Sequence, residues 1–169
     1  LKGEKIMLAP ISWLKDYVDI NCSPETLAKK LVGVGFEVEN IIRQEKQVSK
    51  VVVGKIVSVD KHPNADRLRV TQIDIGSKMI QVVTNVPVVG GEVIAVALDG
   101  AMLADGHEIK KGELRGVVSE GMLCSLGELG LTLGDFPYAI EDGIFIMQEP
   151  CKAGDDIHTV LGLDDTVID

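Results

Sequence analysis

The sequence predicts a mainly β protein with a small α/β segment at its start. Between residues 51 and 118, five short β-rich segments follow one another, separated by turn residues such as Gly76 and Gly90-Gly91. Five short strands in roughly 70 residues are typical of a small antiparallel barrel or sandwich. With 46% apolar and 25% charged residues, the 169-residue chain has the balance of a globular protein.

The first forty residues predict a small α/β unit. Ser12 is a suitable N-cap for a short helix over 13–18, and Ser23 with Pro24 begins a longer helix. The run from Phe36 to Ile42 alternates apolar and polar residues, as a half-buried strand does. This unit is too small to hold a hydrophobic core alone.

The β-rich part predicts five strands, followed by less regular elements. Residues 122–131 predict a helical turn or a packed loop, and residues 144–147 a further strand. The five strands are expected at 51–60, 68–75, 79–84, 93–98 and 114–118.

The corner HPNADRLRV, residues 62–70, joins the first two expected strands. A proline and three turn-forming residues end the first strand there. Period-two alternation then places Leu68 and Val70 on one face of the second strand, and Arg67 and Arg69 on the other. We therefore expect the two apolar side chains to fill the interior and the two guanidinium groups to face outward.

A second cationic loop follows at residues 105–116, which read DGHEIKKGELRG and carry Lys110, Lys111 and Arg115. If the strands form an oligonucleotide-binding (OB) barrel, this loop joins strands four and five, and the 62–70 corner joins strands one and two. In that fold these two loops and the strand 2–3 face bind oligonucleotides. The alternative is that these are ordinary solvated charges, offset by neighbouring acidic residues.

Aromatic residues are absent between Phe36 and Phe136. Single-strand binders of the OB fold normally stack bases on aromatic rings, and only His62 and His107 offer a ring here. An RNA-binding barrel of this sequence should therefore contact the phosphates and recognise the shape of the RNA. Its affinity should be modest and sensitive to salt.

The net charge of −9 is unevenly distributed. Residues 1–40 carry a net charge of −1, residues 41–116 of +2, and residues 117–169 of −10. The middle segment is thus compatible with nucleic-acid binding, although a strong binder is usually more basic.

No catalytic or metal site is expected. The three cysteines form no CxxC pair, and the histidines show no metal-ligand spacing. A nucleophile elbow and a complete dinucleotide fingerprint are missing too. No apolar run of membrane-spanning length and no secretion signal are present.

Several motifs together resemble the N-terminal region of the bacterial phenylalanyl-tRNA synthetase β subunit. They are MLAPISWLKDYVDI (7–20), VVVGKIVSVDKHPNADRLRV (51–70), LRGVVSEGMLCSLGELGL (114–131) and LGLDDTVID (161–169), in the family's order. The resemblance implies an OB-fold tRNA-binding domain at 41–149, inserted into a small α/β domain formed by 1–40 and 150–169. Residues 1–6 are then a leader or cloning remnant, and the chain is expected to be truncated at its end.

The resemblance also implies partners and chemistry. The partners are tRNA, the α subunit of the synthetase and the remaining β-subunit domains, in the cytoplasm, with no membrane and no DNA. ATP and Mg²⁺ are expected for the whole ligase but no cofactor for this fragment, which is expected to be non-catalytic. Two alternatives remain: a module for subunit assembly, and a standalone tRNA-binding or chaperone OB protein.

The candidate RNA-binding residues combine the two loops with the family motifs. Val88 and Ala104 depart from the asparagine and proline that are usual in the family near the RNA-facing rim, which weakens the expectation of strong affinity. Ser119 and Glu120 fit either a polar rim or the end of a strand. The candidates are Lys61, His62, Asn64, Arg67, Arg69, Lys110, Lys111, Arg115, Ser119, Glu120 and Met122.

Overall fold

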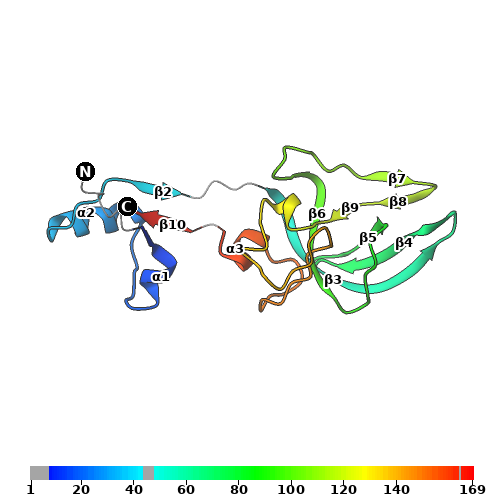
Figure 1. Cartoon of the computed structure of the whole chain (residues 1–169), viewed down its shortest axis with the longest axis horizontal. Coiled ribbons are helices and arrows are strands. Elements are labelled where there is room, and N and C mark those ends of the chain that lie inside the picture. The colour runs from blue at the N-terminus through cyan, green and yellow to red at the C-terminus, as the bar shows by residue number, and fades with distance from the viewer. Residues whose placement is uncertain (1–7, 44–47, 164) are drawn as a thin grey trace. The chain divides into compact units, whose positions relative to one another are not determined.

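The computed structural model describes residues 8–43, 48–163 and 165–169, and is mainly β. The expected leader at residues 1–6 lies outside the described residues. The chain divides into two compact units (Figure 1). The small unit comprises Leu1–Lys46 and Gly162–Asp169, and the large unit comprises Gln47–Leu161. In sequence, the large unit is therefore flanked on both sides by parts of the small one.

The division between the units differs from the expected boundaries at 40/41 and 149/150. Residues 150–161 belong to the large unit, because they hydrogen-bond to its first long strand. The Val53 N–H donates to the Asp155 carbonyl at 2.9 Å, and the Gly154 N–H donates to the Val53 carbonyl at 2.8 Å. Ile157 is fully buried beside them.

The small unit holds two helices and a three-stranded antiparallel sheet in the order β1-β10-β2. The expected cap at Ser23 is confirmed, since its Oγ accepts from the Thr26 N–H at 3.3 Å. The expected strand 36–42 is largely wrong, because only its last two residues enter β2. The elements are β1 (Ala9–Pro10), α1 (Ile11–Lys15), α2 (Pro24–Gly33), β2 (Ile41–Arg43) and β10 (Thr166–Ile168).

The expected cap at Ser12 is wrong. Helix α1 begins at Ile11, so that Ser12 lies inside it. The Ser12 N–H donates to Oδ1 of Asp165 at 3.2 Å, and its hydroxyl donates to Oδ2 of the same carboxylate. A partner 153 residues away has thus replaced the local cap.

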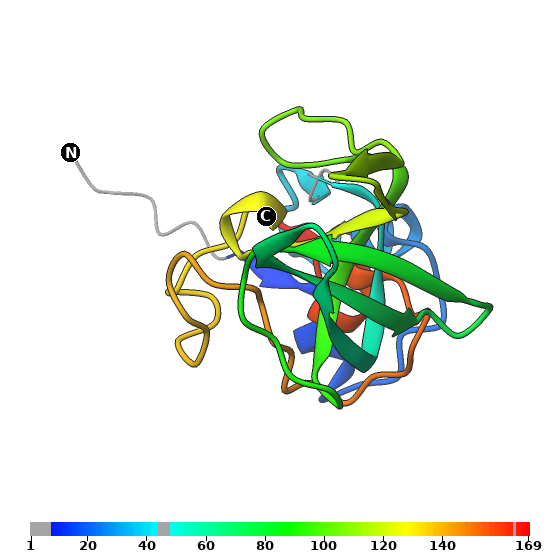
Figure 2. The same cartoon turned by 90° about the vertical axis from the view of Figure 1, so that its right-hand side faces the viewer.

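The large unit contains a five-stranded antiparallel sheet in the order β5-β4-β3-β6-β9, together with the separate hairpin β7-β8. Figure 2 shows the strong twist of this sheet. Its strands are β3 (Ser49–His62), β4 (Ala65–Asp74), β5 (Met79–Thr84), β6 (Val93–Met102) and β9 (Gly121–Leu123). The other elements are β7 (Gly112–Leu114), β8 (Val117–Ser119), the 3-10 helix η1 (Gly127–Leu129) and α3 (Ile157–Leu161).

The first four expected strands of this unit are confirmed, whereas the later elements differ. The segment expected as a fifth strand at 114–118 instead forms most of the β7-β8 hairpin, and β9 is the fifth strand of the sheet. The helical turn expected within 122–131 is present as η1. Residues 144–147 form only one isolated bridge, between Ile94 and Ile146.

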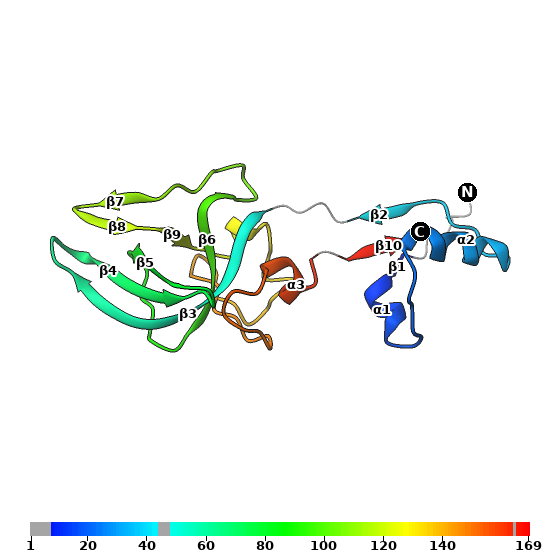
Figure 3. The same cartoon turned by 180° about the vertical axis from the view of Figure 1, so that it is seen from behind.

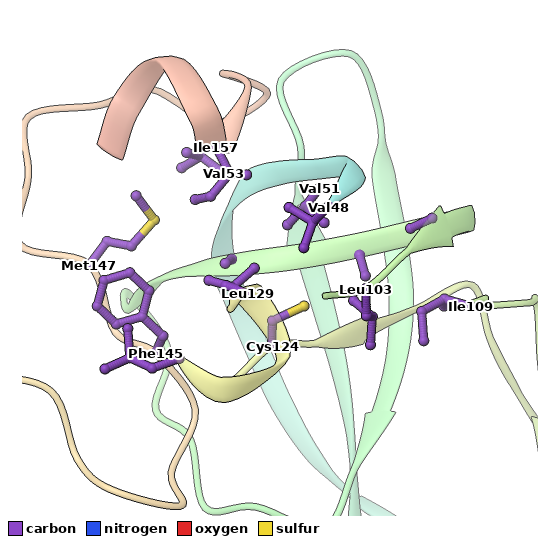
Figure 4. Close-up of a cluster of buried hydrophobic side chains, with 14 residues drawn as sticks. Val48, Val51, Val53, Leu103, Ile109, Cys124, Leu129, Phe145, Met147 and Ile157 are labelled. Carbon is purple, nitrogen blue, oxygen red and sulfur yellow. The ribbon is translucent and has the colours of Figure 1, made fainter. Parts of the chain in front are cut away.

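Two apolar cores lie on opposite faces of β6. Ile94 and Val96 belong to one core, and Ala95 and Ala97 to the other. Figure 4 shows the second core, where Val53, Cys124 and Phe145 meet side chains from α3 and η1. Burial raises the pKa of the Cys124 thiol to about 12, so this thiol stays protonated and acts as an apolar packing group.

The free edge of β5 is covered by the β8–β9 connection. The Glu120 N–H donates to the Gln81 carbonyl at 2.8 Å, and the Gln81 N–H donates to Oε2 of Glu120 at 3.0 Å. Two residues further along β5, the Val83 N–H donates to Oγ of Ser119 at 3.0 Å. Backbone groups that an edge strand would leave unpaired are therefore satisfied.

Within the described residues, no helix has the length and hydropathy needed to cross a membrane.

Candidate nucleic-acid interface

The β3–β4 corner and the β7–β8 turn lie side by side at one end of the large unit (Figures 1 and 3). Nε2 of His62 lies 2.8 Å from the Leu114 carbonyl oxygen. Nδ2 of Asn64 donates to the Arg115 carbonyl at 3.0 Å. The two loops expected to carry the cations are therefore joined by hydrogen bonds.

The ring of His62 is buried, with only 5% of the residue exposed. Besides the contact with Leu114, its Nδ1 accepts from the Asn64 N–H at 3.0 Å. Both ring nitrogens are thus engaged within the fold, so His62 presents no open ring face on which a base could stack. The expectation that His62 offers a stacking ring is wrong.

The arginines of the corner differ in their surroundings. Nη1 of Arg69 donates to the Asp66 and Leu68 carbonyls, both at 3.0 Å, and this side chain is folded back on its own strand. Arg67 is exposed. Among the described residues, neither Arg67 nor Lys61 has a side-chain hydrogen bond or a charged partner.

The period-two alternation along β4 holds, but the expectation that Leu68 and Val70 face the interior is wrong. The fully buried side chains of this strand are those of Thr71 and Ile73, and the regular pairing with β5 places Arg69 on the same face as these two. Leu68 and Val70 are only half-buried. The physical reason is that β4 extends beyond the end of the core, so that Arg69 occupies a core-facing position where no core remains.

The cations of the second loop are partly neutralised. Nζ of Lys110 lies 3.4 Å from a carboxylate oxygen of Glu108, and Nζ of Lys111 lies 3.6 Å from a carboxylate oxygen of Glu120. Exposed pairs of this kind contribute little to stability, but they reduce the charge available to a phosphate. Arg115 is exposed, and within the described residues its guanidinium has no such partner.

The last three candidates are engaged within the fold. Ser119 is 6% exposed, and its Oγ accepts from the Val83 N–H and donates to the Gly121 carbonyl. The Gln81 N–H, and secondarily Lys111, hold the pKa of Glu120 below its usual value, although burial opposes them. Met122 is half-buried against the core. These positions fit the strand-end interpretation better than the polar-rim interpretation.

A cleft of about 470 Å³ opens beside the corner. Its lining is mainly apolar and contains no aromatic ring. Sequence reasoning missed this cleft, because its walls come from five separate stretches of the chain that only the tertiary fold brings together. Residues that line it include Leu68, Val83, Leu114, Met122, Asp142 and Ile144.

Comparison with known proteins identifies the family. Residues 51–156 match the sequence model of the tRNA_bind family, described as "Putative tRNA binding domain". The matched segment covers most of the chain and nearly all of the large unit, including both cationic loops. The chain belongs to this family.

The relatives that the chain matches over almost its whole length are phenylalanine–tRNA ligase β subunits. The identity is 39% with that of Latilactobacillus sakei, 42% with that of Staphylococcus haemolyticus and 41% with that of Clostridium acetobutylicum, each over 96% of this chain. The resemblance inferred from the motifs is thereby confirmed. The chain spans only about a fifth of the length of these relatives, 20 to 21%.

Among solved structures, a MetRS related protein from Pyrococcus horikoshii matches with a TM-score of 0.44 and 19% identity. The match covers 62% of this chain and 85% of that protein.

Proposed function

We propose that the large unit binds tRNA through the cations of the joined β3–β4 corner and β7–β8 turn. Lys61, Arg67 and Arg115 are the residues that we assign to phosphate contacts. The observation that carries this proposal is the pair of hydrogen bonds from His62 and Asn64 to the β7–β8 turn, because they bring two cationic loops to one end of the unit. Membership of the tRNA_bind family supports it.

The mode of binding is contact with the backbone and shape of the RNA. Three of the chain's aromatic rings lie in the large unit, and they pack on one another: Phe136 and Phe145 have centroids 5.2 Å apart, and Tyr138 stacks on Phe145 at 6.0 Å. None of the three lies in the cationic loops. Affinity should therefore depend on cations and fall steeply with salt.

The five-stranded sheet of the large unit closes, in this proposal, into an OB barrel. Support comes from the hydrogen bonds by which Ser119 and Glu120 attach the β8–β9 connection to β5. The two end strands of the sheet order, β5 and β9, would then lie next to each other and close the barrel. Closure would leave two regions free for RNA: the face of β4 and β5, which are the second and third strands of the barrel, and both cationic loops.

The whole protein is, by this proposal, a phenylalanine–tRNA ligase β subunit of the cytoplasm, in which a small α/β domain is interrupted by the barrel. Adenylation with ATP and Mg²⁺ would take place on the partner α subunit, and this chain would contribute RNA affinity without a cofactor. The identity of about 40% with such β subunits supports this assignment.

A role in assembly is a second proposed function, and the small unit favours it. Several large apolar side chains of this unit are exposed, and two of them, Trp13 and Tyr17, form an edge-to-face pair with centroids 5.6 Å apart. Exposed apolar side chains that lie against one another, as these two rings do, are typical of contacts with other proteins or domains. The exposed set is Leu8, Trp13, Tyr17, Val18, Val32, Val34, Phe36 and Ile42.

Fluorescence anisotropy with labelled tRNA tests the main proposal. The 169-residue chain is titrated at low and near-physiological salt, as wild type and as the triple variant Lys61→Ala, Arg67→Ala, Arg115→Ala. The expected result is a weaker affinity and a shallower salt dependence for the triple variant. The control is Lys55→Ala with Lys152→Ala, which removes two exposed cations away from the corner, where the triple variant removes three. Equal losses in both variants would contradict the assignment.

A further inference from the structure

The two hydrogen bonds of the His62 ring determine its protonation state. The Asn64 N–H donates to Nδ1, so that nitrogen carries no hydrogen. Nε2 must then carry the proton and donate to the Leu114 carbonyl at 2.8 Å. Only the neutral ring with its hydrogen on Nε2 satisfies both contacts. A protonated ring would direct an N–H group at the Asn64 N–H.

A second hydrogen bond joins the corner to the next residue of the β7–β8 turn. The Asn64 side chain donates to the Arg115 carbonyl, so the corner engages two consecutive carbonyl groups of the turn. Arg115 has φ = 50°, a left-handed conformation that is uncommon for a residue other than glycine. A Cβ on Gly116 would lie 3.4 Å from Nδ2 of Asn64, which shows how closely the two loops approach.

We propose that His62 and Asn64 are positioning residues, which hold the turn bearing Arg115 against the corner bearing Arg67, and that His62 does so only as a neutral ring. They are then not RNA contacts themselves. A strained turn without these ties would sample other conformations, and Arg115 would have to be ordered at the moment of binding. The effect of these residues on affinity rests on the proposed tRNA-binding function. The hydrogen bonds that join the two loops do not depend on that function.

The alternative, in which His62 is a cation that contacts phosphate, predicts the opposite dependence on pH. Protonation would strengthen a phosphate contact, whereas it would break the hydrogen bond that Nδ1 accepts. The 5% exposure of His62 already argues against a contact. The charged residues of the corner and of the β7–β8 hairpin, the two segments that the ring joins, are Lys61, Asp66, Arg67, Arg69, Glu113 and Arg115.

A double-mutant cycle tests positioning through Arg115. The affinity for labelled tRNA is measured for His62→Ala, Arg115→Ala and the double variant. We expect His62→Ala to weaken binding about threefold to tenfold in the wild-type background and less than about twofold when Arg115 is already absent. His107→Ala, which removes an exposed ring of the same loop system, is the control and should have little effect. The same loss in both backgrounds would overturn the proposal.

The pH profile gives a second, independent reading of the role of His62. Wild type and His62→Gln are compared from about pH 8 to about pH 5.5, the range in which histidines titrate. Where the ring becomes protonated, the affinity of the wild type should fall relative to that of the variant, because the hydrogen bond that Nδ1 accepts is lost. A relative rise would identify His62 as a phosphate contact and overturn the proposal.

Hydrogen exchange separates the tie from the RNA function. In the free protein, the Asn64 amide should exchange faster in His62→Ala than in wild type or His107→Ala, with the β7–β8 amides following it. Unchanged exchange would show that His62 does not hold the two loops together, whatever the RNA data show. If the wild type binds no tRNA while exchange changes as expected, the proposed function and the positioning role for RNA fail, and the tie between the loops stands.

Discussion

The ring of His62 lies 2.8 Å from the carbonyl oxygen of Leu114, a residue 52 positions further along the chain. This contact explains why the motif HPNADRLRV carries a histidine at the end of a long β-strand. The ring is buried where the strand leaves the core, and together with the Asn64 side chain it joins the β3–β4 corner to the β7–β8 turn. The cationic end of the large unit therefore depends on a neutral side chain for its arrangement.

Arg67 and Arg69 should have different effects on RNA binding. Arg67 is exposed, so we expect Arg67→Ala to weaken tRNA affinity and to lower the slope of log affinity against log salt by about 1. Arg69 is bonded to two carbonyls, so Arg69→Ala should leave the slope nearly unchanged and reduce the free energy of unfolding by about 1 kcal/mol. Anisotropy titrations and urea unfolding measure the two effects. The same slope change in both variants would contradict this division.

Much of the fold could be predicted from local patterns. The strand at 79–84 and the helix begun by Ser23 and Pro24 are set by β-branched composition and by a cap, which act within a few residues. Strand β10 and the bond from Ser12 to Asp165 could not be predicted, since they depend on residues more than 100 positions apart in sequence. Such pairings leave no periodic signal in either partner.

Ser119→Ala should destabilise the large unit. The variant removes the acceptor of the Val83 N–H and leaves a buried donor without a partner, which typically costs about 1 to 3 kcal/mol. Ser77→Ala, at an exposed turn position, is the matched control. Urea unfolding followed by circular dichroism measures both. A loss no larger than that of the control would show that the β5 edge does not depend on this hydroxyl.

Stability at acidic pH should depend on Glu120. Its pKa is lowered mainly by the hydrogen bond from the Gln81 N–H and further by Lys111. A carboxyl group whose pKa is lowered by folding contributes stability above its unfolded pKa, and this contribution is lost as pH falls through the folded pKa. The wild type should therefore lose more stability than Glu120→Gln between about pH 5 and about pH 3. Parallel unfolding curves at each pH test this; an equal acid loss in both proteins would contradict it.

The candidate site was only partly predictable, because sequence shows charge but not its partners. The corner and the second loop were expected to carry cations, and the structure brings them together. The pairing of Lys111 with Glu120 and the folding back of Arg69 depend on tertiary distances. The same is true of Ser119, whose hydroxyl could serve a rim or a strand edge with equal plausibility until its neighbour on β5 is known.

The attachment of residues 150–161 to the sheet should be sensitive to one methyl group. Gly154 has φ = 92°, and a Cβ there would lie 2.6 Å from the carbonyl oxygen of Ile75, a backbone atom that cannot rotate away. Gly154→Ala should therefore destabilise the large unit by about 2 kcal/mol or more.

Gly106→Ala separates the two causes of this effect. Gly106 has a similar φ of 85°, but a Cβ there would meet no atom within 4 Å, so this variant carries only the backbone strain, about 1 kcal/mol. Thermal unfolding of both variants measures the difference, which is due to the close approach of two backbone turns. Because α3 begins three residues after Gly154, the larger loss should be accompanied by faster hydrogen exchange at Ile157. Equal losses in the two variants would mean that the 75–76 and 153–154 turns separate at little cost, and that the core contacts of α3 alone hold this segment in place.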